Sequence, residues 1–416
     1  MSTVVCILEG KLLIIGAGIE QIYAYQTAKK MGFSVVGTDA NPNAPALIYS
    51  DEKLIASTRD PQATIEAVKS LKDYKSIKGV ITLANDVPYT VAYVAEVLGL
   101  PSISLKTAAL SSDKLKMKNR FRDSDVNTPV FAEAKTYQDL QKFIQQWGYP
   151  AVAKPTDGRG SRGVVFIDEN SDLEWVFSYC LSHSCSNKII IEKFIEGKQI
   201  STEGLVVEGK IFNSGYADRN YEQLQNFKPF ILEDGGSMPS KISNLLRKKI
   251  DKQLSKAAQA IELNNGSIKG DIVIDDDQNV YVIEIATRLS GGFFCTDQIP
   301  VTTGVDLVLQ SIRLAVGLPV EIDDLIPKHL CFSEIRYWFP KIGKLVNVPN
   351  INSILAENNV LKAMLLHPKK TNFMEVSKHS DRLGFVIVTS KHGHEFTKKR
   401  ADKIINKYYK DFEFLE

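Results

Sequence analysis

A lysine and the glycine-rich loop after it are the first residues of this chain whose types and spacing could do chemistry. Lys154 ends an apolar run, and a second run starts at 165, so the segment reads as strand, loop, strand. The loop between them contains Gly158, Arg159, Gly160, Ser161, Arg162 and Gly163. Closely spaced glycines let backbone N–H groups approach an anion, and the cations suit phosphate oxygens. A flexible hairpin with solvated cations is the alternative.

Two carboxylates lie on a segment that reads as a hairpin. Asp271 opens one apolar run, Glu284 ends the next, and the polar stretch 275–279 separates the runs. Residues near the open ends of an antiparallel pair face each other across the ladder. An unpaired buried Glu284 would be costly, and a bound cation removes that cost; oxygen ligands suit Mg²⁺ bridging to phosphates. An ion pair between Glu284 and Arg288 is the alternative.

A third cluster, Gly16-Ala17-Gly18, follows the apolar run 11–15. A dinucleotide fingerprint needs a further glycine three residues on, and the chain has Gln21 there. Asp39, which closes the next apolar run, could hold a ribose hydroxyl or could be a polar strand terminus. The cluster therefore favours a tight turn that lines a small-molecule site, with NAD binding by a dehydrogenase as the alternative.

The elements that must position these residues fall into three regions. Apolar runs at 11–15, 33–38 and 79–83 alternate with helix-spaced segments, which predicts a doubly wound parallel sheet over about the first 105 residues. Ser111-Ser112-Asp113 then signals a helix start, and short strands and hairpins are predicted from about 129 to 215. The predicted helices cover 19–31, 61–72, 88–98, 241–263, 305–316 and 395–409.

Length and composition limit the classes of function. The chain has 416 residues, 44% hydrophobic and 24% charged, which suits a soluble protein of several domains. A formal charge of +2 provides no field for nucleic acid or a membrane surface, so neither partner is expected. The N-terminus MSTVVCILEG lacks the basic start of a signal peptide, and the five cysteines show no CxxC spacing. We therefore expect reduced thiols and a cytoplasmic location.

In this order along the chain, the motifs resemble the ATP-grasp superfamily of ligases, in its carbamoyl-phosphate-synthase-like and biotin-carboxylase-like branch and of the amino-acid-ligase type. The matching segments are SSDKLKMK, YPAVAKPTDGRGSRGV, IIIEKFIEGKQIST, GDIVID and VIEIATRLSGG. The resemblance implies a mixed α/β and α+β chain. It places a doubly wound preATP-grasp domain over 1–105, an ATP-grasp fold over 106–320 with a mobile lid at about 129–193, and a small α+β C-terminal domain over 321–416.

The resemblance also implies a role for each site residue. Lys114 and Lys154 would bind ATP phosphates, and Asp271 and Glu284 would bind Mg²⁺, with Mn²⁺ as an alternative. Arg288, which with Lys154 makes up the catalytic pair, would stabilise the acyl phosphate or the tetrahedral intermediate. The remaining nucleotide contacts would come from the lid loop and the adenine hinge: Gly158, Gly160, Ser161, Gly163, Glu192 (at the adenine amino group), Lys193, Phe194, Ile195 and Gln199.

Two positions depart from the family's usual pattern. Gln199 stands where the family usually has a glutamate on the ribose, and an amide can still bond the ribose hydroxyls. Ala286 stands where the family usually has a metal-binding asparagine, so the number of metal ions stays open.

The implied reaction activates a carboxylate as an acyl phosphate, converts ATP to ADP and phosphate, and transfers the acyl group to an amine, forming an amide or peptide bond. The partners would be a small carboxylate and an amine, such as amino acids, with a homodimer as one option for assembly. A bicarbonate-using carboxylase or carbamoyl-phosphate-type enzyme is one alternative. A non-catalytic nucleotide-binding protein is another, motivated by Ala286.

The substrate pocket depends on fewer signals. The candidates facing it are Asn85, Asp86, Arg219, Tyr221 and Arg288. Asn85 and Asp86 could instead cap the helix at 88–98, which they precede. Arg219 could clamp a carboxylate or lie on the solvated surface.

Overall fold

The computed structural model describes residues 9–415. Residues 1–8 and 416 lie outside the described part, and with them Cys6 and most of the segment used to argue against a signal peptide. The four described cysteines are free thiols. Among residues 9–415, no helix combines the length and the apolar composition that a bilayer crossing requires.

The N-terminal region is the parallel sheet that the sequence predicts. Its strands run in the order β3, β2, β1, β4, at Glu52–Ile55, Ser34–Asp39, Lys11–Ile15 and Ile77–Ile81. Helix α1 (Ile22–Lys30) covers one face and α2 (Pro61–Lys69) and α3 (Pro88–Leu98) cover the other. Because side chains alternate along a strand, Leu12 packs in the first core and Leu13 in the second.

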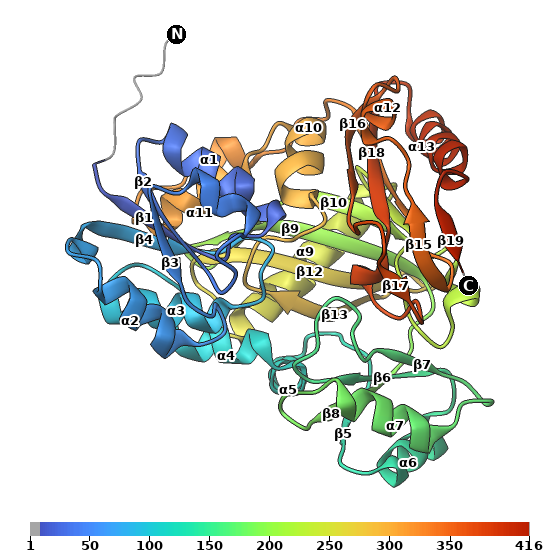
Figure 1. The fold of residues 1–416 in the computed structure, drawn as a ribbon. Coiled ribbons are helices and arrows are strands. Elements are labelled where there is room, and N and C mark those ends of the chain that lie inside the picture. Colours follow the sequence, from blue (N-terminus) through green and yellow to red (C-terminus); the bar gives the residue numbers. More distant parts are fainter. Residues whose placement is uncertain (1–8, 416) are drawn as a thin grey trace.

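A helix from much later in the chain completes this region. Helix α11 (Leu307–Ala315) packs against α1 and β4, and its apolar residues share one core with those of β1 and α1. The fit is close at Gly79, where a Cβ would lie 2.7 Å from the carbonyl oxygen of Ala315. The N-terminal sheet is therefore fixed to the rest of the molecule, and so is the turn that follows β1 (Figure 1).

The centre of the molecule is an eight-stranded sheet that crosses the predicted boundary at residue 320. Its order is β13, β12, β9, β10, β11, β14, β18, β16, at Val280–Ala286, Gly266–Ile274, Lys198–Val207, Lys210–Asn220, Gly235–Met238, Phe332–Trp338, Gly384–Ser390 and Val360–Leu365. Helices α5 (Lys114–Asp123) and α9 (Asn244–Ala260) pack on β12 and β13. The sheet is continuous from β11 to β14, so a division of the chain at 320 stays a prediction.

The C-terminal residues add a small second layer to the end of this sheet. A three-stranded sheet, β17 (Asn372–Phe373), β15 (Gly343–Asn347) and β19 (Glu413–Leu415), packs with α13 (His394–Tyr409) against β14 and β18. The remaining helices are α4 (Leu105–Ser112), α8 (Leu224–Phe227), α10 (Ile299–Thr303) and α12 (Ile351–Leu355), with a π-helix at Phe294–Gln298.

A separate antiparallel sheet stands below the central one in Figure 1, in the segment predicted as the lid. It has the order β5, β8, β6, β7, at Phe131–Ala134, Ile189–Lys193, Ala151–Pro155 and Val165–Ile167. The prediction of strands and hairpins alone was wrong here, because α6 (Tyr137–Trp147) and α7 (Leu173–Ser182) cover this sheet. A capping interaction marks the start of α6, where Asp139 accepts hydrogen bonds from the Thr136 backbone and hydroxyl.

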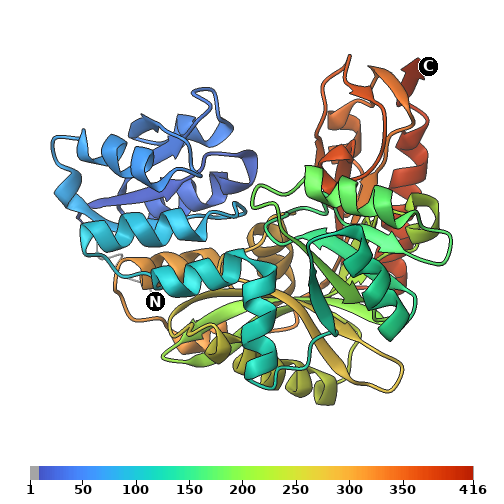
Figure 2. The ribbon, with the colours of Figure 1, turned by 90° about the horizontal axis from the view of Figure 1, so that it is seen from below.

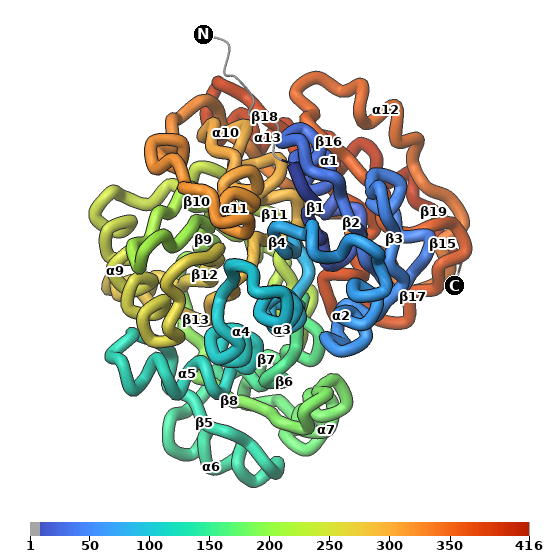
Figure 3. Tube along the Cα trace, turned by 90° about the vertical axis from the view of Figure 1, so that its left-hand side faces the viewer, coloured from blue at the N-terminus to red at the C-terminus, as the bar shows by residue number. Residues whose placement is uncertain are grey.

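The three regions surround the predicted site. Figure 2 shows the N-terminal region and the C-terminal region on opposite sides, with the central sheet joining them and the lid sheet in front. In Figure 3 the lid sheet again stands apart from the N-terminal sheet and connects to the body through α5 and β8.

Candidate active site

One cleft of about 1290 Å³ lies where the three regions meet. Every residue that the sequence assigned to the site lines it except Gly163. Gly163 lies behind the loop, with φ at +70° and space for no Cβ, which would come within 2.7 Å of His183. It supports the loop's shape without lining the cleft.

Lys114 connects the start of α5 to the glycine-rich loop. Asp113 caps this helix by accepting hydrogen bonds from the backbone N–H groups of Leu115 and Lys116, both at 3.0 Å, as the helix-start signal predicted. The Lys114 ammonium donates to the carbonyl oxygen of Gly158 at 2.7 Å and lies 3.2 Å from Glu284. One lysine therefore faces both the loop and the predicted metal site.

A buried group of three charges lies next to this loop. Lys154 on β6 lies 3.0 Å from Glu192 Oε1 on β8, and Lys118 on α5 lies 3.1 Å from Glu192 Oε2. Burial opposes ionisation of Glu192, but the two lysine charges outweigh it and hold the pKa of this carboxyl below its usual range. The carboxylate is thus available as an acceptor at the cleft wall.

The predicted hinge leaves β8 beside this group. The backbone N–H groups of Lys193 and Phe194 donate to the carbonyl oxygens of Val130 and Pro150 at 2.9 and 3.1 Å. The Phe194 ring packs edge-on against Phe166, with centroids 5.0 Å apart. These contacts fix the segment, and Phe194 and Ile195 give the cleft an apolar stretch of wall.

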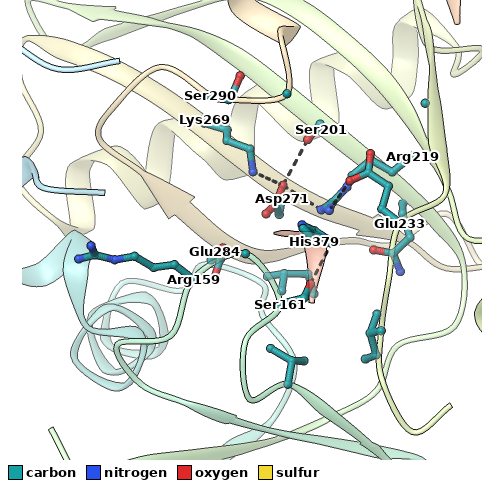
Figure 4. Close-up of a pocket in the computed structure, with 18 of the residues that line it drawn as sticks. Arg159, Ser161, Ser201, Arg219, Glu233, Lys269, Asp271, Glu284, Ser290 and His379 are labelled. Atoms are coloured by element: carbon teal, nitrogen blue, oxygen red, sulfur yellow. Dashed lines mark hydrogen bonds and ion pairs between the residues drawn. The ribbon is translucent and has the colours of Figure 1, made fainter. Parts of the chain in front are cut away.

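Asp271 and Glu284 are directly opposite each other in the β12–β13 ladder, as their spacing predicted. Asp271 Oδ1 contacts Lys269 at 2.5 Å, Arg219 at 3.2 Å and the Ser201 hydroxyl at 3.3 Å (Figure 4). Among the described residues Oδ2 has no such partner, and Glu284 is bonded only through Lys114. Two carboxylates with free oxygens fit a hard cation such as Mg²⁺.

The same residues limit how much of a metal's coordination the chain can supply. Within residues 9–415 there is no group of three or more acidic, histidine or cysteine side chains arranged for a metal. Ala286 offers no ligand, so a cation here would take its remaining ligands from phosphate oxygens or water. The alternative of an ion pair between Glu284 and Arg288 is not what forms, since Arg288 pairs with Asp86.

Comparison with known families agrees with this geometry. Residues 111–292 match the family model described as an ATP-grasp domain, and residues 12–96 match the one described as a PylC-like N-terminal domain. The chain carries an ATP-grasp domain. The predicted fold class is confirmed with it, because solved proteins of this fold align over nearly the whole chain.

The relatives differ in name and length. The L-amino acid ligase from Bacillus licheniformis superposes with a TM-score of 0.81 at 21% identity, over 98% of this chain and 99% of that one. The mitochondrial propionyl-CoA carboxylase alpha chain of Sus scrofa is 24% identical over 74% of this chain, which spans only 44% of that protein. The alanine–anticapsin ligase of Bacillus subtilis is 25% identical over 48% of this chain and 46% of its own length.

The far end of the cleft is built around Arg288. Its Nε donates to Asp86 at 2.5 Å, so Asp86 is an ion-pair partner and not a helix cap. Helix α3 has Val87 at its N-cap without a side-chain cap, which removes the capping alternative for Asn85 as well. Both residues line the cleft with Arg288. We refer to this end as the acceptor end and to the Glu192 end as the nucleotide end.

Two glutamates that the sequence reading missed shape the loop after Arg288. Glu20, in the turn after β1, accepts a hydrogen bond from the Gly292 backbone, and a Cβ at Gly291 would lie 2.7 Å from its Oε2. Glu203 on β9 is fully buried beneath the loop and accepts from both the backbone N–H and the hydroxyl of Ser290. Burial raises the pKa of Glu20, and raises that of Glu203 to about 7.

The first glycine cluster has a structural role at this end. Asp39 accepts from the backbone N–H groups of Ala17 and Asn41, both at 2.9 Å, so both of its oxygens hold the turn. The Gln21 side chain fills the space above Gly16, where a dinucleotide would need the third glycine. The turn fits the small-molecule site that we expected from it, and not the dinucleotide fingerprint.

The C-terminal region contributes residues that no sequence motif marked. Arg382 stacks on Tyr337 with its guanidinium carbon 3.6 Å from the ring centroid, and its Nη2 lies 3.8 Å from Glu233. Glu233 in turn pairs with Arg219 at 3.0 Å, so Arg219 is a largely buried member of the site and not solvated surface. His379 contacts the lid loop, with its ring nitrogen 3.1 Å from the Ser161 hydroxyl (Figure 4).

Local signals existed for some of these residues and not for others. Lys118 lies four residues after Lys114 at the start of a predicted helix, a spacing that puts both on one face. Glu203 lies between Ile200 and the apolar run 205–207, a weaker form of the signal that singled out Glu284. No comparable signal surrounds His379, Arg382 or Glu20 in the sequence, because only the packing of separate regions brings these residues to the cleft.

Proposed function

We propose that the protein is an ADP-forming carboxylate–amine ligase, which activates a carboxylate as an acyl phosphate and passes the acyl group to an amine. One observation carries the proposal: Lys114, Lys154, the lid loop and the Asp271–Glu284 pair line the same cleft as Arg288. A phosphate-binding end and a carboxylate-binding end therefore share one space, as in-line transfer from ATP to a carboxylate requires.

The chain's charges would overcome the repulsion between the two anions. Lys114, Lys154 and the backbone N–H groups of the lid loop would hold the phosphates, and Arg288 would hold the attacking carboxylate. Arg288 would then stabilise the oxyanion that forms when the amine attacks the acyl carbon. Bound between Asp271 and Glu284, Mg²⁺ would supply further neutralisation of phosphate charge.

The lid loop would protect the intermediate, because an acyl phosphate hydrolyses in water. Lys114 and His379 both bond backbone atoms of this loop: Lys114 donates to Gly158, and the His379 backbone donates to the Gly160 carbonyl at 3.2 Å. These bonds join the lid to the helix below it and to the C-terminal region above it, which is the arrangement expected of a closed lid.

An amine is favoured over bicarbonate by the charges of the acceptor end. Arginines (Arg288, Arg382) and glutamates (Glu20, Glu233) both face it, and paired opposite charges suit a zwitterion such as an amino acid. Two relatives also carry ligase names with an amino acid in them, the L-amino acid ligase and the alanine–anticapsin ligase.

The test is ADP release from ATP, measured against pairs of amino acids and small carboxylic acids. ADP formation that needs both a carboxylate and an amine, with the amide detected by mass spectrometry, would support the proposal. The Glu284→Gln protein, prepared in parallel, measures any contaminating ATPase. AMP and pyrophosphate as products, bicarbonate-dependent turnover, or ATP binding without turnover across the panel would each contradict it.

A further inference from the structure

Glu192 carries one negative charge and contacts two lysines, which is one positive charge more than it can balance. Lys118 and Lys154 approach opposite oxygens of this carboxylate at 3.1 and 3.0 Å, and all three side chains are almost completely buried. Two positive charges next to one negative charge leave an excess of one in a region with little water to screen it. A buried excess positive charge is costly unless another anion binds close to it.

The two lysines are held in different ways. Lys118 is fully buried, does not line the cleft, and donates to the Thr128 hydroxyl at 2.8 Å. Thr128 in turn donates to the Val282 carbonyl at 2.8 Å, which anchors Lys118 to the central sheet. Lys154 lines the cleft, and Glu192 is its single charged partner among the described residues. Lys154 is therefore the one that can leave for a phosphate.

Glu192 also has an unused acceptor. Its Oε1 is buried and receives no hydrogen bond within residues 9–415, although Lys154 lies 3.0 Å away at an unfavourable angle. A buried carboxylate oxygen without a donor is uncommon, because leaving it unpaired costs stability. Since Glu192 lines the cleft, the missing donor fits an N–H group of a ligand.

We propose that Lys118 is a positioning residue: it keeps Glu192 charged and aimed at the nucleotide base after Lys154 has moved to the triphosphate. The inference rests on the nucleotide site of the proposed function and adds the exchange of one cation between Glu192 and ATP. The triphosphate would be the anion that balances the excess positive charge. Lys118 then balances Glu192 alone, and Oε1 accepts a hydrogen bond from the base.

The ionised Glu192 would make the site prefer a purine that has a 6-amino group over one that has a 6-oxo group. A carboxylate held ionised by Lys118 accepts from the 6-amino group of adenine and repels the 6-oxo group of hypoxanthine. Without Lys118, Glu192 would be a buried charge with no partner once Lys154 leaves, and it would take up a proton. A protonated carboxyl can donate to a 6-oxo group, so the preference for adenine would disappear.

The test compares ADP and IDP binding by titration calorimetry for the wild type, Lys118→Met and Lys116→Met. Lys116 lies on the same helix, is exposed, and serves as the matched control. We expect Lys118→Met to weaken ADP binding about 10- to 100-fold, the worth of one hydrogen bond to a charged group, and to bring the ADP/IDP ratio close to one. Lys116→Met should match the wild type. An unchanged ratio in folded Lys118→Met protein would overturn the proposal.

A double variant keeps the test decisive if Lys118→Met does not fold. In the Glu192→Gln background no charge needs balancing, so adding Lys118→Met should change ADP affinity by less than about twofold. A further tenfold loss there would show that Lys118 acts independently of Glu192, and the proposal would be wrong. Absence of ADP binding by the wild type would instead count against the proposed function, which separates the two failures.

Discussion

The nucleotide end of the cleft takes its charges from neighbouring segments of the chain, whereas the acceptor end takes them from three distant regions. Lys114, Lys118, Lys154 and Glu192 fall within 79 residues of one another, on α5 and the lid sheet. Glu20, Arg288 and Arg382 come from the N-terminal turn, the loop after β13 and the segment just before β18. Lys154 and Glu192 can move with the lid, whereas Lys114 and Lys118 stay on α5, which packs on the central sheet. The acceptor end needs the whole body to be assembled.

This difference suggests a division of labour. Lid movement would bring Lys154 and Glu192 toward Lys114 and Lys118 on the body, so the nucleotide contacts can close on ATP without disturbing the acceptor residues. The acceptor end is fixed by shared cores, such as the one that joins α11 to the N-terminal sheet. Variants at one end should therefore leave the other intact, and variants where the ends meet should affect both.

Glu284 lies where the two ends meet, and its loss should have the largest effect. We expect Glu284→Gln to reduce turnover by about 100-fold or more, because it removes a metal ligand and the partner of Lys114. ADP binding measured in EDTA should change little, since the residues around the base and Lys154 are untouched and Lys114 keeps its bond to the Gly158 carbonyl. Asp276→Asn, an exposed change in the same hairpin, should retain full turnover. A Glu284→Gln protein with normal kcat would remove the metal site from the proposed mechanism.

Arg288 tests the acceptor end alone. Arg288→Gln combined with Asp86→Asn, which avoids an unpaired buried charge, should lower kcat/KM for the carboxylate by about 100-fold. The affinity for ADP should stay within about twofold of wild type, because no nucleotide contact changes. Arg313→Gln on the exposed side of α11 is the control for loss of an arginine. An equal loss of ADP affinity would show that the two ends are not separate.

His379 tests the bond between the lid and the body. Burial, and then the charges of Arg382 and Arg219, hold the pKa of His379 well below its usual range, while Asp271 opposes and Lys269 adds to this effect. The lid loop contacts His379 through Ser161 and Gly160, so opening the lid would remove part of the burial, and the open state would bind the proton more tightly. Acidification below about pH 6.5 should therefore favour the open lid, by up to tenfold per pH unit.

Titration of ADP affinity between pH 7.5 and 5.5 measures this effect. Wild type should lose affinity more steeply than His379→Asn, which cannot take up the proton, although His379→Asn should bind more weakly at pH 7.5 through loss of the Ser161 contact. His392→Asn, an exposed histidine of the same region, should follow the wild-type curve. Parallel curves for all three proteins would exclude His379 as the titrating group.

The same contrast explains how much the sequence could predict. Segments at 11–15, 151–155 and 280–286 carry their chemistry within a few residues, so strand, loop and charge could be read together, and Asp271 and Glu284 were placed opposite each other from spacing alone. The helices α6 and α7 were missed because the alternation of apolar residues around them was read as strands. Arg382 and His379 could not be predicted, because their partners Glu233 and Ser161 lie more than a hundred residues away.

Glu203 offers the smallest and most specific test, because it supports the acceptor loop without lining the cleft. Burial raises its pKa to about 7, whereas an unfolded glutamate has its ordinary value near 4.5. The folded state thus binds the proton more tightly, so the contribution of Glu203 to stability is full below about pH 4.5 and is lost as pH rises through 7. Glu203→Gln mimics the protonated form: its amide oxygen can accept from the Ser290 backbone N–H, and its NH₂ group can donate to the Ser290 hydroxyl oxygen.

The expected result is therefore a gain that depends on pH. Glu203→Gln should raise the melting temperature by roughly 2–4 °C at pH 8, since the ionised wild-type group costs on the order of 1 kcal/mol or more there, and should change it little at pH 5. Glu208→Gln, an exposed change on the turn after the same strand, should be neutral at both pH values. If Glu203→Gln instead destabilises the protein equally at pH 5 and pH 8, the Ser290 bonds need a carboxylate. The acceptor loop would then rest on a buried charge, as the nucleotide end does, and the two ends would be more alike than their construction indicates.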